Sequence, residues 1–547
     1  MKIKSLLTWL CVVASGISMS AYAESSAPGN PLTVDSFIEQ AKLTAMDGAA
    51  GDNLGIAVAF NNDGNTAIVG AYGANVGGDS DQGAAYVFTR SGTTWTEEKK
   101  IIVADGAVYD DFGRSVSLSS NGNTAIIGAD GVNVDTNNNQ GAAYVFTRSG
   151  TAWTQQAKLT ATDGIANDHF GASVALSSDG NTAIASSYGA NVEGDTARGA
   201  VYVFTRSGTA WTQQTKLIAA DGAAYDYFGR SVALNSDGNT AIAGAYQADV
   251  GGDSDRGAAY VFARSGTTWT EQEKLFASAG TADDQFGRSV ALNSDGNTAI
   301  VGAYTANVAG NINEGAACVF TRSGNVWTEQ ANLLATDGAA SNCFGVAVAL
   351  SSDGDTATIG AYLADVGGES DQGAAYVFTR SGTAWTQQVK MTAADGAAVD
   401  RFGYSVALSG DGYTTGAGAY QADVSGDSDR GAAYVFAVPP PPTGVSASFD
   451  FYIDRVRVSW NPANTATGYE VWRATTDDSA QAASIGTGIT VTNYDDTAAT
   501  AGTSYYYWTK TINANGTSVF STASATGRML FGPDVRVNGE AGPVTLG

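Results

Sequence analysis

One motif recurs seven times in this chain at a fixed spacing of 58 residues, and this period restricts the fold more than any single residue does. The motif is anchored by a glycine that follows Phe in six copies and Leu in the first. The seven anchors are Gly55, Gly113, Gly171, Gly229, Gly287, Gly345 and Gly403. A period of this length indicates modules that stack in a line or pack around an axis.

The fourth copy shows what one unit contains. Two short apolar runs flank Asp237-Gly238, and this pair predicts a hairpin because Gly adopts positive φ without steric cost. Two more strands are expected at 258–262 and 269–275. In the first three strands apolar or small residues occupy both faces, which predicts sheets covered on both sides. Four-stranded sheets repeated around an axis are the blades of an all-β propeller.

The two ends of the array favour a closed ring. A Trp recurs every 58 residues from Trp95 to Trp385, but the seventh unit ends at 436–438 without one. Residues 37–43 (FIEQAKL) align instead with 327–333 (WTEQANL). The N-terminal segment is therefore predicted to supply the outer strand of the last blade, which leaves no half-built sheet with an unpaired edge. We expect a seven-bladed β-propeller with split-blade closure over residues 37–438.

A second dipeptide that recurs among the repeats is Gly-Ala, as in Gly70-Ala71 and Gly244-Ala245. Together with Phe-Gly it resembles the FG-GAP repeats of integrin α-subunit propellers and their bacterial relatives. The resemblance implies a propeller used for recognition. Tyr or Asp replaces the usual Pro, as at Tyr72 and Asp130, and the third copy reads Ser186-Ser187. The calcium loop of some integrin blades needs several spaced carboxylates, whereas the connection between the first two strands here carries one.

The N-terminal residues predict export. Residues 1–23 combine Lys2 and Lys4 with an apolar stretch and end in the small-x-small sequence Ala21-Tyr22-Ala23, as a signal peptide does. Cleavage near Ala23 would leave an N-terminal linker at 24–36 and a secreted or cell-surface protein. No later run reaches the ~18 apolar residues of a membrane span.

Beyond the ring, residues 439–444 form a Pro-rich linker. Residues 445–528 resemble a fibronectin type III domain, which implies a β-sandwich with Trp460 in its core and Tyr505 or Tyr507 as tyrosine corner. Residues 529–547 are the start of a further module or a tail.

Charge and cysteine content restrict the partners. The formal charge is −26 for the whole chain and −28 without residues 1–23, which hold two Lys and no acid. Such a balance argues against nucleic acid and anionic membranes as partners. A disulfide between Cys318 and Cys343 is the less favoured outcome. We expect a monomer with no cofactor.

Comparing equivalent positions of the seven units separates structural residues from candidate catalytic residues, because a residue that serves the fold should recur in every unit. The sole histidine, His169, occupies a freely varying loop position and has no triad partner. We therefore predict no catalytic residue and no enzyme.

Acidic side chains gather on one rim of the predicted ring. One Asp recurs at the place of Asp221 and another at the place of Asp226, which suggests turn capping by Asx side chains. Further acids occur in only four units and are weak calcium candidates. They are Asp79, Asp81, Asp253, Asp255, Glu369, Asp371, Asp427 and Asp429.

Two functions remain open. The first is a secreted or cell-surface adhesion protein whose propeller rim recognises a protein or glycan without catalysis. The alternative is an accessory or scaffold module of an extracellular polysaccharide-degrading enzyme. Both rest on the resemblance and on one acidic rim, since fold alone does not fix function.

Overall fold

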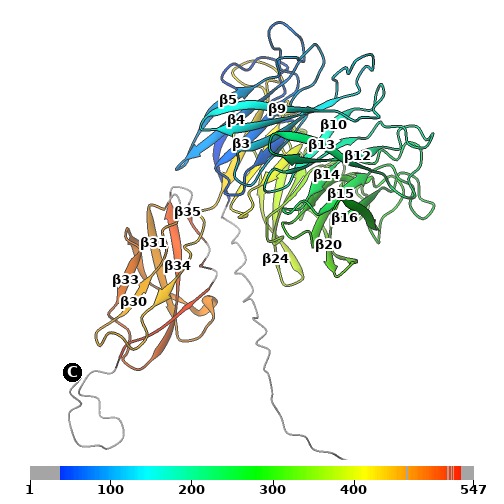
Figure 1. Ribbon diagram of the computed structural model, residues 1–547. Helices are drawn as coiled ribbons and strands as arrows, with labels where there is room; N and C mark the ends of the chain where they lie inside the picture. The colour runs from blue at the N-terminus through cyan, green and yellow to red at the C-terminus, as the bar shows by residue number, and fades with distance from the viewer. Residues whose placement is uncertain (1–36, 464–465, 514–515, 519, 522, 531–547) are drawn as a thin grey trace, which may run out of the picture.

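A computed structural model describes residues 37–463, 466–513, 516–518, 520–521 and 523–530. The predicted signal peptide and N-terminal linker at 1–36, and residues 531–547, lie outside this part of the chain. The described residues form two all-β parts joined by the Pro-rich linker (Figure 1). They contain no helix that is long and apolar enough to cross a membrane.

Seven four-stranded antiparallel sheets follow the 58-residue repeat and are called blades below, since the arrangement is consistent with a seven-bladed propeller. The first blade is β2 (Val58–Phe60), β3 (Thr66–Ala71), β4 (Ala84–Ser91) and β5 (Thr94–Ile101), and the second is β6 (Ser115–Leu118), β7 (Thr124–Ala129), β8 (Ala142–Ser149) and β9 (Ala152–Leu159). The third is β10 (Phe170–Leu176), β11 (Thr182–Ser187), β12 (Ala200–Ser207) and β13 (Ala210–Leu217), and the fourth is β14 (Val232–Leu234), β15 (Thr240–Ala245), β16 (Ala258–Ser265) and β17 (Thr268–Leu275). The fifth is β18 (Phe286–Leu292), β19 (Thr298–Ala303), β20 (Ala316–Ser323) and β21 (Val326–Leu333), and the sixth is β22 (Val348–Leu350), β23 (Thr356–Ala361), β24 (Ala374–Ser381) and β25 (Ala384–Met391). The seventh is β26 (Ser405–Leu408), β27 (Thr414–Ala419), β28 (Ala432–Ala437) and β1 (Ile38–Leu43).

The hydrophobic core lies between neighbouring blades. The second strand of every blade is buried along its whole length, as the apolar and small residues on both faces predict. One cluster joins Val87 of the first blade to Phe112 and Ile127 of the second. The Phe of the repeat packs edge-on against the third strand of its own blade, with Phe112 and Tyr144 ring centroids 5.6 Å apart. Each blade is therefore stabilised mainly by its neighbours.

The first and seventh blades meet in the same way as other neighbours. Strand β1 pairs antiparallel with β28, from Ile38 opposite Ala437 to Leu43 opposite Ala433. Leu54 bridges Gly431 in parallel, as Phe112 bridges Gly83 between the first and second blades. A cluster joins Leu43 and residues of β28 to the core of the first blade.

The anchor glycines shorten some first strands. The apolar run of the fourth unit begins at Phe228, but β14 starts at Val232. Gly229 has φ of 90°, its N–H donates to the Gly244 carbonyl of β15, and Phe228 forms a parallel bridge with Gly199 of the previous blade. The anchor therefore interrupts the regular pairing of the first strand without leaving the sheet, in a conformation that Gly adopts at little cost.

The C-terminal part contains two antiparallel sheets. One is β29 (Ser446–Ala447), β30 (Val456–Ser459) and β33 (Asn493–Asp496). The other is β31 (Gly468–Ala474), β32 (Ala483–Ile489), β34 (Ser504–Asn513), β35 (Gly516–Thr517) and β36 (Ala525–Arg528), with a 3₁₀ turn at Ser479–Gln481. Trp460 and Tyr507 are buried in one cluster, and the Tyr507 hydroxyl donates to Asp496 over 2.9 Å.

Candidate recognition face on the loop rim

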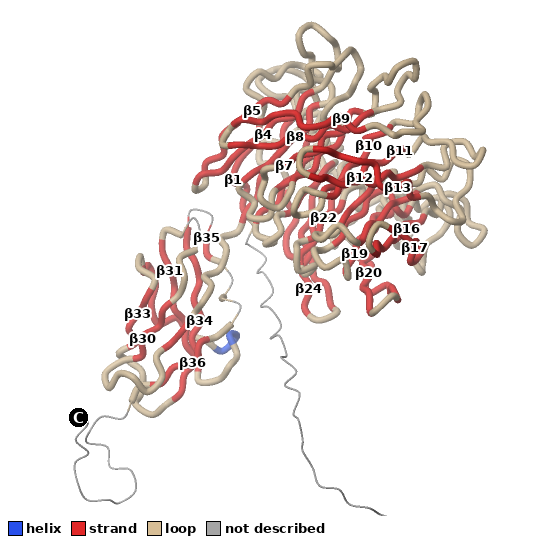
Figure 2. Tube along the Cα trace, viewed as in Figure 1, coloured by secondary structure: helices blue, strands red, loops and turns tan. Residues whose placement is uncertain are grey.

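The connections between strands lie on two rims of the propeller, drawn as tan loops in Figure 2. The loop rim carries the connections after the second and fourth strands of each blade, 72–83 and 102–114 in the first repeat. The turn rim carries the two hairpin turns, 61–65 and 92–93 in the first blade. The loop rim therefore has far more chain with which to form a binding face.

One side-chain hydrogen bond recurs inside the loop after each second strand, beside the loop's backbone hydrogen bonds. In the first blade the Asn75 Oδ1 accepts from the Asp81 N–H over 3.0 Å. All seven units repeat this bond, with acceptors Asn133, Asn191, Asp249, Asn307, Asp365 and Asp423 in the other six. The acceptor residue, which was not predicted from the sequence, is thus a recurring side-chain contribution to the shape of the loop.

The calcium candidates lie in these loops as separate pairs on different blades. Asp253 and Asp427 form ion pairs with Arg256 and Arg430 at 3.3 and 3.2 Å. Asp371 pairs with Arg401 at 3.4 Å. Burial, with Asp283 and Asp249 nearby, raises the pKa of Asp255. The described residues contain no group of three or more His, Cys, Asp or Glu side chains placed to hold a metal ion, and calcium binding stays a prediction.

The Asp that recurs at the place of Asp226 caps a turn, as predicted. Its Oδ2 accepts the Ala223 N–H over 2.8 Å. The same bond forms at Asp52, Asp110, Asp168, Asp284 and Asp400. Burial raises the pKa of Asp226, and this backbone bond opposes the rise.

Turn capping does not describe the other recurring Asp. Asp221 accepts from the Tyr260 hydroxyl at 2.8 Å and from the Lys274 Nζ at 2.8 Å, and so fastens the connection to the blade it enters. Burial would raise the pKa of Asp221, but the bonds from Lys274 and Tyr260 outweigh it and lower the pKa. Asp47, Asp105, Asp163, Asp337 and Asp395 form the same ion pair with the lysine of the blade they enter, and for Asp395 this lysine is Lys42 of β1.

In the fifth blade, all three members of this Asp–Tyr–Lys triad are replaced. Ala279, Cys318 and Asn332 stand where the fourth blade has Asp221, Tyr260 and Lys274. All three line a cavity of about 210 Å³. Cys318 and Cys343 are both buried and free, and they form no disulfide.

A ring of left-handed residues surrounds the mouth of the central channel on the loop rim. The residue two places before each anchor glycine has φ between 52° and 62°, and no unit places Gly there. The seven side chains are Asn53, Asp111, His169, Tyr227, Gln285, Cys343 and Arg401. A bulky residue in this conformation is uncommon and costs roughly 1 kcal/mol or more. All seven units therefore have a non-glycine residue at a position where Gly would fit the backbone better.

Aromatic rings line part of this mouth. His169 stacks on Tyr188 with centroids 5.3 Å apart, and Tyr227 stacks on Tyr246 at 5.7 Å. Tyr188 and Tyr227 lie 6.0 Å apart, which joins the two stacks. His169 also lies 3.9 Å from Asp130. The varying position of His169 is therefore part of an aromatic array, which the sequence alone did not indicate.

The loop-rim end of the channel also contains three arginines, Arg114, Arg230 and Arg288, and Tyr404. Each follows an anchor glycine directly, and the other three units have Ile, Ala or Val there. Burial alone would raise the pKa of Tyr404, but the positive charges of the three arginines and a hydrogen bond with Arg288 bring it to about 8. This cluster was not predicted from the sequence, although three arginines at one register position were a readable signal.

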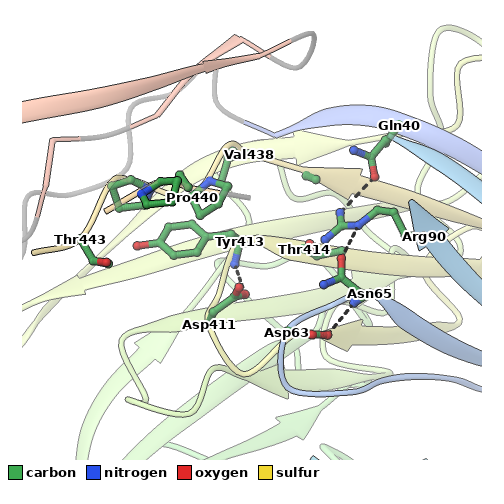
Figure 3. A pocket seen from close by; sticks show the side chains of 14 residues that line it. Gln40, Asp63, Asn65, Arg90, Asp411, Tyr413, Thr414, Val438, Pro440 and Thr443 are labelled. Atoms are coloured by element: carbon green, nitrogen blue, oxygen red, sulfur yellow. Dashed lines mark hydrogen bonds between the residues drawn. The ribbon is translucent and has the colours of Figure 1, made fainter. Parts of the chain in front are cut away.

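A second cavity, of about 230 Å³, lies on the turn rim where the first and seventh blades meet the linker. Figure 3 shows Arg90 between Gln40 of β1 and Asn65, with hydrogen bonds of 3.2 and 2.9 Å. The Tyr413 N–H donates to Asp411, and Pro440 lies beside the Tyr413 ring. Where Tyr413 and Val438 stand, five other blades have an Asn and an Arg, and the sixth has Asp355 and Arg380, so this cavity accommodates the exit of the chain from the propeller.

A model of the FG-GAP repeat matches residues 37–88, 95–146, 153–204, 211–262, 269–320, 327–378 and 385–436. These segments cover more than half of the chain, which therefore belongs to the FG-GAP repeat family, as the Phe-Gly and Gly-Ala steps predicted. No curated protein matches the sequence. Among solved structures, a Fn3-like protein from Clostridium thermocellum is 36% identical over 16% of this chain and 92% of its own, with a TM-score of 0.16. The WD40 repeats of RRP9 are 9% identical over 75% of this chain and 99% of that one, with a TM-score of 0.44.

Proposed function

We propose that this chain is an exported, non-catalytic binding protein that recognises a protein or glycan partner with its loop rim. Membership of the FG-GAP family supports a protein-interaction module. The signal sequence predicted at 1–23 supports secretion or display at the cell surface. The pairing of β1 with β28 supports a ring closed by the two ends of the repeat array. The two sheets after the linker support a fibronectin type III-like spacer.

The ring of left-handed residues at the channel mouth carries this proposal. The backbone there is the same in all seven units, yet the side chains are all different and none is Gly. A position that served only the fold would recur as one residue type, with Gly the least costly. Strained backbone that persists is typical of functional sites. The side chains of this ring are therefore candidates for contact with a partner.

Glycine substitutions in this ring separate binding from folding. Tyr227→Gly and His169→Gly relieve left-handed strain while removing half-buried aromatic rings from the mouth. We expect unfolding free energies within about 1 kcal/mol of the parent and loss of binding to immobilised collagen, mucin or cellulose, whichever the parent binds. Binding is measured by biolayer interferometry.

The matched control lies on the turn rim. Val326 is 64% exposed at the start of β21, next to the hairpin turn that follows β20, so Val326→Ser removes apolar surface from the other rim. It should leave binding unchanged. Equal loss of binding in the Val326 and Tyr227 variants, or no loss in either, would contradict a loop-rim recognition face. Binding to cellulose alone would favour the accessory module of a polysaccharide-degrading enzyme over an adhesion protein.

A further inference from the structure

The arginines of the channel differ from the other arginines of the propeller. Every other one donates a side-chain hydrogen bond to a carboxylate, amide or carbonyl oxygen, as Arg264 does to Asn239 and Arg256 to Ala277. Among the described residues, Arg114, Arg230 and Arg288 form no ion pair. They line one shared cavity without an ion-pair partner, and Arg288 hydrogen-bonds the Tyr404 hydroxyl.

Aromatic rings hold these guanidinium groups in place. Arg114 lies 5.3 Å from the Tyr72 ring, Arg230 5.9 Å from Tyr188, and Arg288 5.6 Å from Tyr304. Cation–π contact orients a guanidinium but leaves its in-plane N–H donors available. The serine hydroxyls that line the same channel are already used between blades, as in the bond from Ser289 to the Gly345 carbonyl. The arginines are thus the main groups free to meet a ligand there.

The three positive charges repel one another in the absence of a counter-ion. The charge of Arg288 and burial together lower the pKa of Arg230 to about 10. The positive charge of the three arginines also affects the ionisation of Tyr404. The rings of Tyr362 and Tyr420 pack against Tyr404, with centroids 5.4 and 4.7 Å from its ring. Asp111 and Asp130 act on Arg114 from the neighbouring connections without forming an ion pair with it. At Arg114 burial would lower the pKa, but Tyr404 and the nearby carboxylates outweigh it and raise the pKa, so the repulsion acts mainly on Arg230.

We propose that the loop-rim end of the channel binds a small oxyanion, as sulfate, phosphate or a carboxylate, free or as the single anionic group of a partner. The cavity holds about 220 Å³, several times the ~30 Å³ that one water occupies in the liquid. Planar guanidinium groups match the oxygens of these anions in pairs. This site deepens the proposed function, because the anion is a chemical feature by which the loop rim selects a partner.

The charge around the site restricts the size of the anion. Apart from Arg230 of the cluster itself, loops of the fourth unit on the same rim carry Asp221, Asp226, Asp249, Asp253 and Asp255 against one base, Arg256. A long polyanion would have to pass these loops, and like charges repel it. One compact anionic group can enter the channel while the rest of the ligand stays clear of the acids. The site is therefore expected to reject polyanions.

Sodium sulfate is the probe that tests the site. Binding is measured by calorimetry, and the melting temperature is compared with sodium chloride at equal ionic strength, because an ion that binds only the folded chain stabilises it. We expect sulfate to raise the melting temperature more than chloride does. Sulfate should also raise the pKa of Tyr404, followed by tyrosinate absorbance with Tyr404→Phe as the blank. Equal effects of the two salts and an unmoved Tyr404 would overturn the proposal.

Alanine variants assign the effect to the cluster. The third unit has Ala172 at this register position. The variants Arg114→Ala, Arg230→Ala and Arg288→Ala therefore introduce a residue that the same position already has in another blade. Each should weaken sulfate binding about tenfold, and the triple variant should abolish it. Without sulfate, Arg230→Ala should melt at or above the parent temperature because a repulsion is removed. Arg206→Ala, on the turn rim, is the control and should leave sulfate affinity unchanged.

The outcomes separate this inference from the proposed function. Unchanged sulfate binding in the triple variant would overturn the inference, and so would tighter binding of dextran sulfate per sulfate group. If sulfate does not bind but Tyr227→Gly still removes partner binding, the proposed function stands alone. If sulfate binds and the loop-rim variants leave partner binding unchanged, the proposed function fails while the oxyanion site remains.

Discussion

The two rims of the propeller use the left-handed backbone region differently. On the turn rim, every described residue with positive φ is glycine, for example Gly238 at 68° and Gly266 at 64°. On the loop rim, Tyr109, Tyr225 and Val399 adopt positive φ as well, although Tyr and Val are poorly suited to it. The turn rim is thus built at the lowest conformational cost, whereas the loop rim retains side chains in spite of that cost.

The rims also differ in how side chains connect neighbouring blades. On the turn rim one pattern recurs, in which the indole N–H of a Trp donates to a Gln or Glu of the previous outer strand, as Trp211 does to Gln156 over 2.8 Å. On the loop rim, Arg, Tyr, Ile, Ala and Val alternate at a single register position around the channel. Repetition identifies contacts that serve the fold, and variation identifies places where the fold leaves the choice open.

The largest test of this comparison removes the strand on which both rims depend. Deleting residues 37–43 exposes the edge of β28 and breaks the ion pair between Lys42 and Asp395. We expect loss of cooperative unfolding, or aggregation through the open edge, measured by calorimetry and light scattering. A chain that begins at residue 37 is the control and should unfold cooperatively. A deletion variant that melts like this control would contradict ring closure by β1.

A buried contact of the turn rim gives the next largest effect. Glu98 accepts from Arg148 and from the Trp153 indole, and its side chain is 8% exposed. Glu98→Ala leaves both donors without an acceptor and should cost about 3 kcal/mol of unfolding free energy. Glu98→Gln is the matched control, since Gln occupies this place in the other units, and it should cost under about 1 kcal/mol. Denaturant titration measures both, and equal losses would show that the contact is not the cause.

Rebuilding the missing triad of the fifth blade sharpens the comparison within the loop rim. The combined change Ala279→Asp, Cys318→Tyr and Asn332→Lys fills a cavity of about 210 Å³ with the contacts of other blades. We expect a gain of about 1–2 kcal/mol at neutral pH. Because the pKa of Asp221 in the same setting is lowered, the ionic part of this gain should exist above the unfolded pKa of ~3.9 and disappear as pH falls through the folded value.

A single substitution separates packing from the ion pair. Cys318→Tyr alone places a buried hydroxyl without its carboxylate partner, which removes part of the benefit of filling the cavity. It should therefore stabilise the chain less than the triple change, with little dependence on pH. If the single and triple variants unfold with the same free energy, the triad contributes nothing beyond volume.

Much of the fold could be predicted because the period places equivalent contacts. A Cβ on Gly70 would lie 1.9 Å from the Gly113 carbonyl oxygen, so the close approach of blades favours Gly at this place, which six repeats have and the third replaces with Ser186. The strand at 37–43 was predictable because its pattern matches 327–333. The joint loss of Ala279, Cys318 and Asn332 from the triad was also readable by comparing repeats, but only once their contact was known.

The channel cluster could not be predicted in the same way. Arg114 and Arg288 are 174 positions apart in the chain, and only the curvature of the ring brings their side chains to one space. The role of a varying residue depends on which part of the molecule its side chain contacts, and the sequence does not show this. For His169, variation predicted an exposed residue without a function, whereas it stacks on Tyr188 at the mouth.

The smallest expected effect concerns calcium on the acidic loop rim. Asp253 already pairs with Arg256, and the Asp255 N–H is held by Asp249 over 3.1 Å, so the loop has its shape without an ion. We expect calcium chloride to change the melting temperature no more than sodium chloride at equal ionic strength, because both only screen a net charge of −26. Asp253→Asn with Asp255→Asn should leave this response unchanged. A larger rise with calcium that disappears in this variant would instead establish ion binding in these loops, since mass action stabilises only a folded site.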